Sequence, residues 1–86
     1  MTFSIDYDQQ PLRFLKQQDK HIAARILDKI EEVLPKRPVS HNAVAIVGEH
    51  NIFRIRVGNY RVLYRINYER QQITVVKIDK RSRAYD

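Results

Sequence analysis

Cysteine is absent from this chain of 86 residues, which excludes a disulfide framework and a thiolate metal site. Glycine occurs only at Gly48 and Gly58, so there is no glycine-rich phosphate-binding loop. No apolar run approaches the roughly 20 residues of a membrane helix, and the N-terminus lacks the basic start and apolar stretch of a secretory signal. We therefore expect one domain over residues 1–86, a cytoplasmic location and no membrane partner.

The positive charge of the chain is concentrated in its second half. Residues 51–86 hold nine lysines and arginines against three acidic residues, whereas residues 1–50 hold seven of each, so the second half accounts for the net charge of +6. Such an asymmetry is typical of a surface that binds nucleic acid or another polyanion. A basic face also serves solubility, and charge alone does not separate the two interpretations.

A β-hairpin is predicted around Gly58 and Asn59. Apolar and basic residues alternate on both sides of this pair, as in half-buried strands, and a Gly-Asn pair favours a two-residue turn. The register that follows gathers the apolar residues on one side of the sheet, with Phe53 opposite Tyr64, Ile55 opposite Val62 and Val57 opposite Tyr60. The other side carries Arg54 opposite Leu63, Arg56 opposite Arg61, and Arg65 further along. Because like charges on adjacent strands repel, a polyanionic ligand explains this arrangement better than folding does.

The other segments predict two helices and further strands. Strands are predicted over residues 2–7, 51–57, 60–67 and 73–79. Residues 43–47 are predicted to form either a strand or an extended connection. One helix is predicted over residues 9–18, with Asp8 as N-cap and with Leu12 and Leu15 buried. A second helix follows the N-cap Asp19 and ends at Pro35. Its apolar stripe consists of Ile22, Ile26, Ile30, Val33 and Leu34.

The predicted fold class is α+β, with the order β-α-α-β-β-β-β. It consists of an N-terminal strand, an αα-hairpin and then an antiparallel sheet. The helices would pack on one face of the sheet and leave the other face open to solvent.

Arg54, Arg56 and Arg61 form the centre of the predicted basic face. A guanidinium binds phosphate oxygens in bidentate fashion and stays charged at physiological pH. Three of them on adjacent strands suit a phosphodiester and the charge that develops on it during cleavage. The alternative is that they are solvated and pair with Asp or Glu, but only three acidic residues lie in this half of the chain.

The C-terminal tail places Lys80, Arg81, Arg83 and Tyr85 just beyond the last predicted strand. Tyr85 can stack on a base or transfer a proton, and Lys80 can contact a phosphate. The alternatives are that Tyr85 covers part of the core and that Lys80 aids solubility. The three histidines lack metal-ligand spacing, so we expect no metal and no cofactor.

Two segments resemble motifs of a known family. Residues 53–64 read Phe-Arg-Ile-Arg-Val-Gly-Asn-Tyr-Arg-Val-Leu-Tyr, and residues 80–85 read Lys-Arg-Ser-Arg-Ala-Tyr. They resemble the hairpin and closing motifs of the RelE/ParE superfamily of bacterial and archaeal toxins, and the likeness is nearest to the RelE branch. The chain length and the predicted element order fit as well, so the resemblance covers residues 1–86 as a single RelE-like toxin domain.

This resemblance implies a toxin of a type II toxin–antitoxin system that is a ribosome-dependent endoribonuclease. Such a toxin cleaves mRNA in the ribosomal A site by attack of a ribose 2′-hydroxyl on the neighbouring phosphate, which leaves a 2′,3′-cyclic phosphate and a 5′-hydroxyl. Carried over by position, the catalytic residues are Arg61, Arg81 and Tyr85. The implied RNA-binding residues are Arg54, Arg56, Arg65, Lys80 and Arg83. The implied partners are a RelB-like antitoxin, the ribosome and mRNA.

The chain departs from the RelE pattern at Arg54 and Arg56, where well-known members have lysines. An arginine does not lose its proton in a basic cluster, so these positions supply no general base. Tyr85, Lys80 or the ribosome then does that work, or catalysis relies on electrostatics and orientation. The tail is also short, and we expect no C-terminal helix over the site. A gyrase-inhibiting toxin, as in the ParE branch, and a non-catalytic basic binding domain are the alternative functions.

Overall fold

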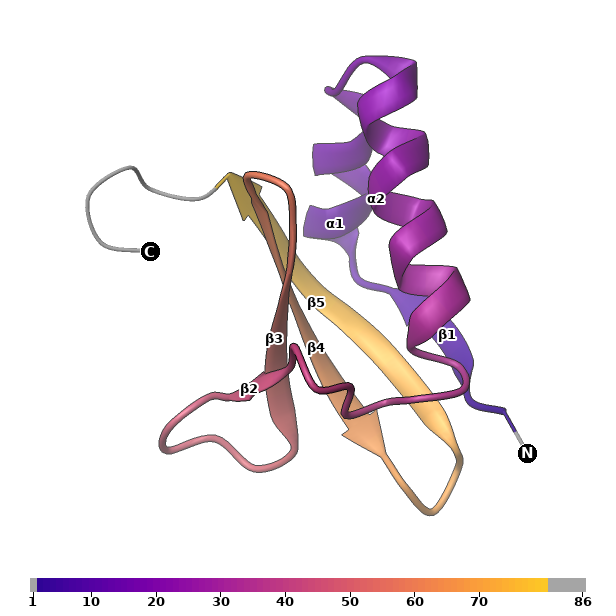
Figure 1. Ribbon diagram of the computed structural model, residues 1–86, viewed down its shortest axis with the longest axis vertical. Coiled ribbons are helices and arrows are strands. Elements are labelled where there is room, and N and C mark those ends of the chain that lie inside the picture. Colours follow the sequence, from indigo (N-terminus) through magenta and orange to yellow (C-terminus); the bar gives the residue numbers. More distant parts are fainter. Residues whose placement is uncertain (1, 81–86) are drawn as a thin grey trace.

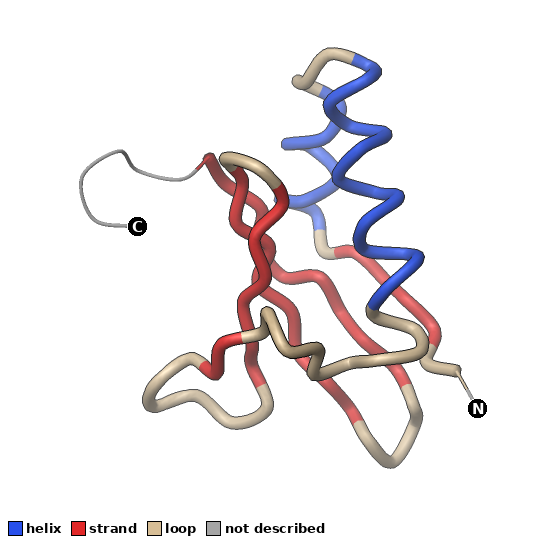
Figure 2. Tube along the Cα trace, in the orientation of Figure 1, coloured by secondary structure: helices blue, strands red, loops and turns tan. Residues whose placement is uncertain are grey.

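The computed structural model describes residues 2–80, which form two helices and a five-stranded sheet (Figures 1 and 2). The elements in chain order are β1 (Ser4–Tyr7), α1 (Gln9–Lys16), α2 (Lys20–Val33), β2 (Val44–Ala45), β3 (Ile52–Val57), β4 (Tyr60–Asn67) and β5 (Gln72–Lys80). This order confirms the predicted succession of strands and helices. Neither of these two helices is long and apolar enough to cross a membrane.

The sheet is mixed, with the strand order β1-β5-β4-β3-β2. Strands β2, β3, β4 and β5 pair with one another in antiparallel fashion, as predicted. Strand β1 instead runs parallel to β5, with Ile5 opposite Ile73, so the prediction of an antiparallel sheet was wrong for this strand. The two helices between β1 and the later strands allow this parallel pairing, and apolar alternation alone does not reveal the direction of a neighbouring strand.

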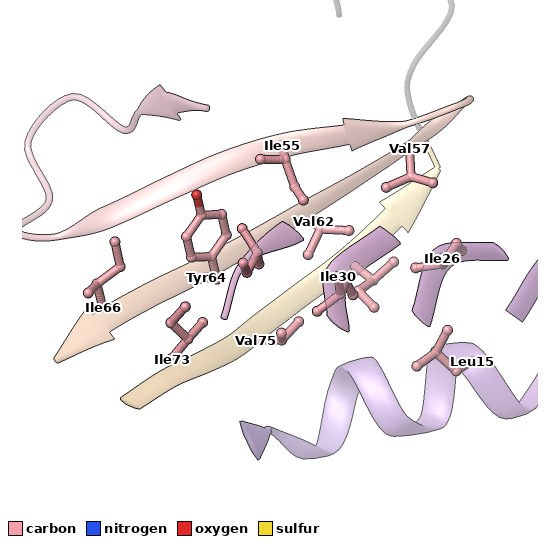
Figure 3. Packing of buried hydrophobic residues seen from close by; sticks show 12 residues of the cluster. Leu15, Ile26, Ile30, Ile55, Val57, Val62, Tyr64, Ile66, Ile73 and Val75 are labelled. Atoms are coloured by element: carbon pink, nitrogen blue, oxygen red, sulfur yellow. The ribbon is translucent and has the colours of Figure 1, made fainter. Parts of the chain in front are cut away.

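Both helices lie against one face of the sheet, and no element of residues 2–80 packs over the other face, which we call the open face (Figure 1). Figure 3 shows how apolar side chains of the helices and the strands meet in this layer. The buried core consists of Leu15, Ile26, Ile30, Leu34, Ile55, Val57, Val62, Tyr64, Ile66, Ile73, Val75 and Ile78. The predicted burial of Leu12 was wrong, because this side chain is 47% exposed. Pro11 and Leu15, one turn apart, are the buried residues of α1.

Gln10 of α1 continues the edge pairing of β5 beyond the end of β1. Its side-chain Nε2 donates a hydrogen bond to the carbonyl oxygen of Ile78 at 2.8 Å, and its Oε1 accepts one from the Ile78 amide at 2.9 Å. The amide group of one side chain thus replaces a strand residue and satisfies both backbone groups of a fully buried position. These two hydrogen bonds fix α1 against β5.

Two tyrosine hydroxyls tie other parts of the chain together. Tyr7 donates to Oε2 of Glu31 at 2.6 Å, which joins β1 to α2, and Tyr64 donates to the carbonyl oxygen of Pro38 at 2.5 Å, which fixes the connection after α2. Burial, with a smaller contribution from Tyr68, raises the pKa of Tyr64 to about 12. Burial and the bond to Glu31 also raise the pKa of Tyr7. Both hydroxyls therefore keep their protons near neutral pH and have structural roles.

Candidate functional site

The β3–β4 hairpin has the predicted register and presents its arginines on the open face. Arg54 lies opposite Leu63, Arg56 opposite Arg61, and Arg65 opposite Ile52. The turn depends on Gly58, whose φ of +59° favours glycine. A Cβ at this position would also lie 2.7 Å from Nη2 of Arg25, so the side chain of this α2 residue reaches the turn.

Arg61 is the middle residue of a charged row that crosses three strands on the open face. Arg56 of β3 lies on one side of it and Asp79 of β5 on the other. Nε of Arg61 donates a hydrogen bond to Oδ1 of Asp79 at 3.0 Å, and the two side chains are 25% and 28% exposed. Nζ of Lys77 lies 3.7 Å from the second carboxylate oxygen of Asp79. Arg61 therefore fits the alternative interpretation, in which an arginine of this face pairs with an acidic residue.

A β-bulge in β5 explains why Asp79 faces Arg61. Leu63 pairs with Lys77 but the next residue, Tyr64, pairs with Val75, so Val76 is an extra residue in β5. Residues Ile73, Val75 and Ile78 are accordingly buried, with a spacing of two and then three. Uninterrupted alternation would have turned Asp79 toward the core with Val75, whereas the bulge turns it toward the open face.

Arg54 occupies an unusual environment for a cation. Its Nε is buried and has no hydrogen-bond partner among residues 2–80. Its cross-strand neighbours are the apolar residues Val44 and Leu63. A hollow of about 330 Å³ is lined by Asn42, Val44, Arg54 and Arg56. An unpaired buried donor is costly. Arg54 also lines the hollow, where its guanidinium could meet an anionic oxygen.

A second hollow, of about 270 Å³, lies between α2 and β3, and we call it the helix–strand groove. Val33 and Ile55 form part of its apolar lining, and the residues around them are mostly basic. The charged residues of its lining are Lys29, Lys36, Arg37, Arg56 and Glu32. Asn42 and Arg56 line both hollows, so the open face and the groove meet at these two residues.

The structure thus brings three of the predicted site residues, Arg54, Arg56 and Arg61, onto adjacent strands of one face. Arg65 is exposed on the same face. Lys80 is also exposed but lies opposite Tyr60, on the helix side of the sheet. Sequence reasoning missed Asp79, because the adjacent apolar residues Val75 and Val76 break the alternation but do not show which residue is the extra one.

Arg81, Arg83 and Tyr85 lie outside the described residues. The three histidines are exposed on separate segments. No group of three or more His, Cys, Asp or Glu side chains that could hold a metal occurs between residues 2 and 80.

A family model described as the ParE toxin of the type II toxin–antitoxin system parDE matches residues 5–85. The chain belongs to this toxin family. Its membership confirms the expected place in the RelE/ParE superfamily. No curated protein sequence matches the toxin significantly.

Solved structures of RelE toxins share the fold of this toxin. The RelBE2 toxin–antitoxin complex from Mycobacterium tuberculosis contains a chain that is 23% identical, with a TM-score of 0.83 over 94% of this chain and 100% of the other. The RelE–RelB complex from Pyrococcus horikoshii OT3 gives 27% identity and a TM-score of 0.80 over 98% and 100%. The isolated Escherichia coli RelE toxin gives 20% identity and a TM-score of 0.80 over 95% and 87%. The predicted fold class is thereby confirmed, with the sheet corrected to mixed.

Proposed function

We propose that this toxin is a ribosome-dependent endoribonuclease that cleaves mRNA in the ribosomal A site and so stops translation. The observation that carries the proposal is the cluster of Arg54, Arg56 and Arg61 on one open face, with a buried Nε on Arg54 that has no acceptor among residues 2–80. Mutually repelling cations on adjacent strands are costly to the fold, and a phosphodiester would offset that cost. The likeness of the fold to RelE toxins supports the same function.

In the proposed reaction the 2′-oxygen of a ribose attacks the neighbouring phosphorus, and the bond from phosphorus to the 5′-oxygen breaks. Negative charge builds up on the phosphoryl oxygens, where a preorganised guanidinium stabilises it. Arg61 takes this role, and Arg54 and Arg56 bind the neighbouring phosphates of the RNA backbone. Arg81 and Tyr85 are proposed as the remaining catalytic residues, and Arg65, Lys80 and Arg83 as further RNA contacts.

The general base is best assigned to Tyr85 or to the ribosome. Arginines at positions 54 and 56 stay protonated and therefore cannot accept the proton of the 2′-hydroxyl. Lys80 is a weaker candidate, because it lies on the helix side of the sheet, away from Arg61. Arg54, Arg56 and Arg61, which we call the arginine face, then contribute positive charge and orient the RNA. These two effects account for much of the rate enhancement in phosphoryl transfer.

Expression of the toxin in bacterial cells should arrest growth by depleting intact mRNA. Purified toxin should cut mRNA that is positioned on ribosomes, leave the same free mRNA largely uncut, and give fragments with 2′,3′-cyclic phosphate ends. Primer extension and end-group analysis measure these products. Intact ribosome-bound mRNA in the presence of folded toxin would contradict the proposal.

A gyrase-inhibiting toxin is the second candidate, and the ParE family model is the observation that favours it. The two candidates differ in their first effect inside the cell. Loss of DNA supercoiling before any decline of mRNA would support the gyrase target, whereas cleaved mRNA with normal supercoiling supports the ribonuclease. If the toxin binds RNA but does not cut it, the third alternative, a non-catalytic basic binding domain, is supported.

We also propose a RelB-like antitoxin as the partner that neutralises the toxin, since the similar solved chains include RelE–RelB complexes. The helix–strand groove combines apolar surface with basic residues, which suits an acidic or amphipathic segment that orders on binding. Both this partner and the proposed target place the toxin in the cytoplasm.

The affinity of toxin and antitoxin should fall as salt concentration rises, because charge contributes to their association. Calorimetric titration of the toxin with its antitoxin at several salt concentrations measures this effect. Lys29→Ala in the groove should weaken binding more than Arg13→Ala on the exposed side of α1. Equal affinities for these two variants would contradict the proposed docking surface.

A further inference from the structure

We infer that Asp79 is a positioning residue, which holds the guanidinium of Arg61 in the orientation that phosphate binding requires. The inference rests on the proposed endoribonuclease function. Asp79 accepts a hydrogen bond from Nε of Arg61 at 3.0 Å, across directly paired strands. A bond at Nε fixes both the direction of the side chain and the plane of the guanidinium, which is the quantity that bidentate recognition of a phosphate depends on.

The backbone of β5 is built so that this contact forms. The extra residue Val76 shifts the alternation of the strand, which keeps Ile78 in the core and turns Asp79 to the open face beside Arg61. On the other side of Arg61, Arg56 of β3 repels its guanidinium toward β5. The carboxylate of Asp79 attracts the guanidinium in the same direction and ends in a defined hydrogen bond, so both neighbours favour one orientation of Arg61.

An acidic residue beside a proposed RNA site needs a reason, because its charge disfavours a polyanion. Asp79 lowers the net positive charge of the arginine face, so its removal should not weaken RNA binding. Its loss should instead reduce the turnover of bound RNA, because an arginine that is misplaced by about 1 Å can cost up to 10²-fold in rate. Orientation rather than affinity is therefore the property expected to suffer.

The test compares kcat and KM of Asp79→Ala, Asp79→Asn and the native toxin on ribosome-bound mRNA. In Asp79→Ala, kcat should fall about 10-fold or more while KM stays unchanged or decreases. Asp79→Asn should retain most of the activity, because its amide oxygen can still accept the Nε–H bond. Glu69→Ala, which removes an exposed carboxylate from the β4–β5 turn, is the matched control and should behave as the native toxin.

A double-mutant cycle with Arg61→Ala separates positioning from other roles, because a residue that acts through Arg61 has no effect once Arg61 is absent. The fall in kcat caused by Asp79→Ala should therefore vanish in the Arg61→Ala background. An equal fall in both backgrounds would overturn the inference. So would an Asp79→Asn variant as inactive as Asp79→Ala with an altered pH profile, since Asp79 would then be transferring a proton.

The Nε–H resonance of Arg61 in ¹⁵N NMR spectra reports the contact without any activity. It should move in Asp79→Ala and stay in Glu69→Ala, and a resonance unchanged in Asp79→Ala would overturn the inference. Absence of cleavage by the native toxin would overturn the proposed function and this inference with it. Native cleavage with an unchanged kcat in Asp79→Ala would overturn the inference alone.

Discussion

Arg61→Ala should lower the rate of ribosome-dependent cleavage by about 10²-fold or more, which is typical for the loss of one preorganised donor that stabilises transition-state charge. The free energy of unfolding should change by less than about 1 kcal/mol. The substitution removes the partly exposed ion pair with Asp79 and also the repulsion from Arg56, and these two effects oppose each other. Cleavage assays and thermal melts measure the two effects separately.

Arg61→Lys and Arg70→Ala are informative companions to this variant. The lysine should restore only part of the activity, because an ammonium does not reproduce a bidentate guanidinium. Arg70 is exposed in the turn between β4 and β5, so its removal takes away one positive charge far from the arginine cluster. A large loss of stability in Arg61→Ala, or equal losses of activity in Arg61→Ala and Arg70→Ala, would show that Arg61 has no specific role.

The sequence was sufficient to predict the hairpin that carries the site. A Gly-Asn pair between two alternating segments defines both the turn and the register, and the register decides which residues share a face. The local pattern therefore suffices to predict that Arg54, Arg56 and Arg61 share one face of the sheet. The buried stripe of α2 was predictable for a similar reason, because the 3.6-residue period of a helix is a local property.

Features that depend on distant segments were not predictable. The parallel pairing of β1 with β5 joins residues near opposite ends of the chain, and local alternation is the same for either strand direction. The bulge at Val76 lies within a run of β-branched residues that reads as an ordinary strand. If the alternation that begins at Ile73 and Val75 is continued without a bulge, Asp79 is expected on the core face of β5. Its contact with Arg61 on the open face is then not predicted.

Arg54→Met should make the toxin more stable and at the same time nearly inactive. Methionine keeps most of the length and the apolar stem of the side chain but removes the buried Nε that has no partner within residues 2–80. Because burying an unsatisfied donor costs roughly 1–3 kcal/mol, the free energy of unfolding should rise by about 1 kcal/mol. Cleavage should fall by about 10²-fold, since the hollow beside Asn42 would lose one of the two guanidinium groups that line it.

Arg13→Met is the matched control, because Arg13 is an exposed arginine of α1 and its substitution should leave stability and cleavage nearly unchanged. Arg54→Lys tests the departure from the RelE pattern. It introduces a lysine, as in the RelE pattern, whose flexible ammonium can reach a phosphate and can lose its proton, so cleavage should remain well above that of Arg54→Met. Opposite changes in stability and activity are the diagnostic result, because binding sites commonly keep groups that destabilise the fold. A destabilised Arg54→Met variant with native activity would instead mean that Arg54 supports the sheet and does not bind RNA.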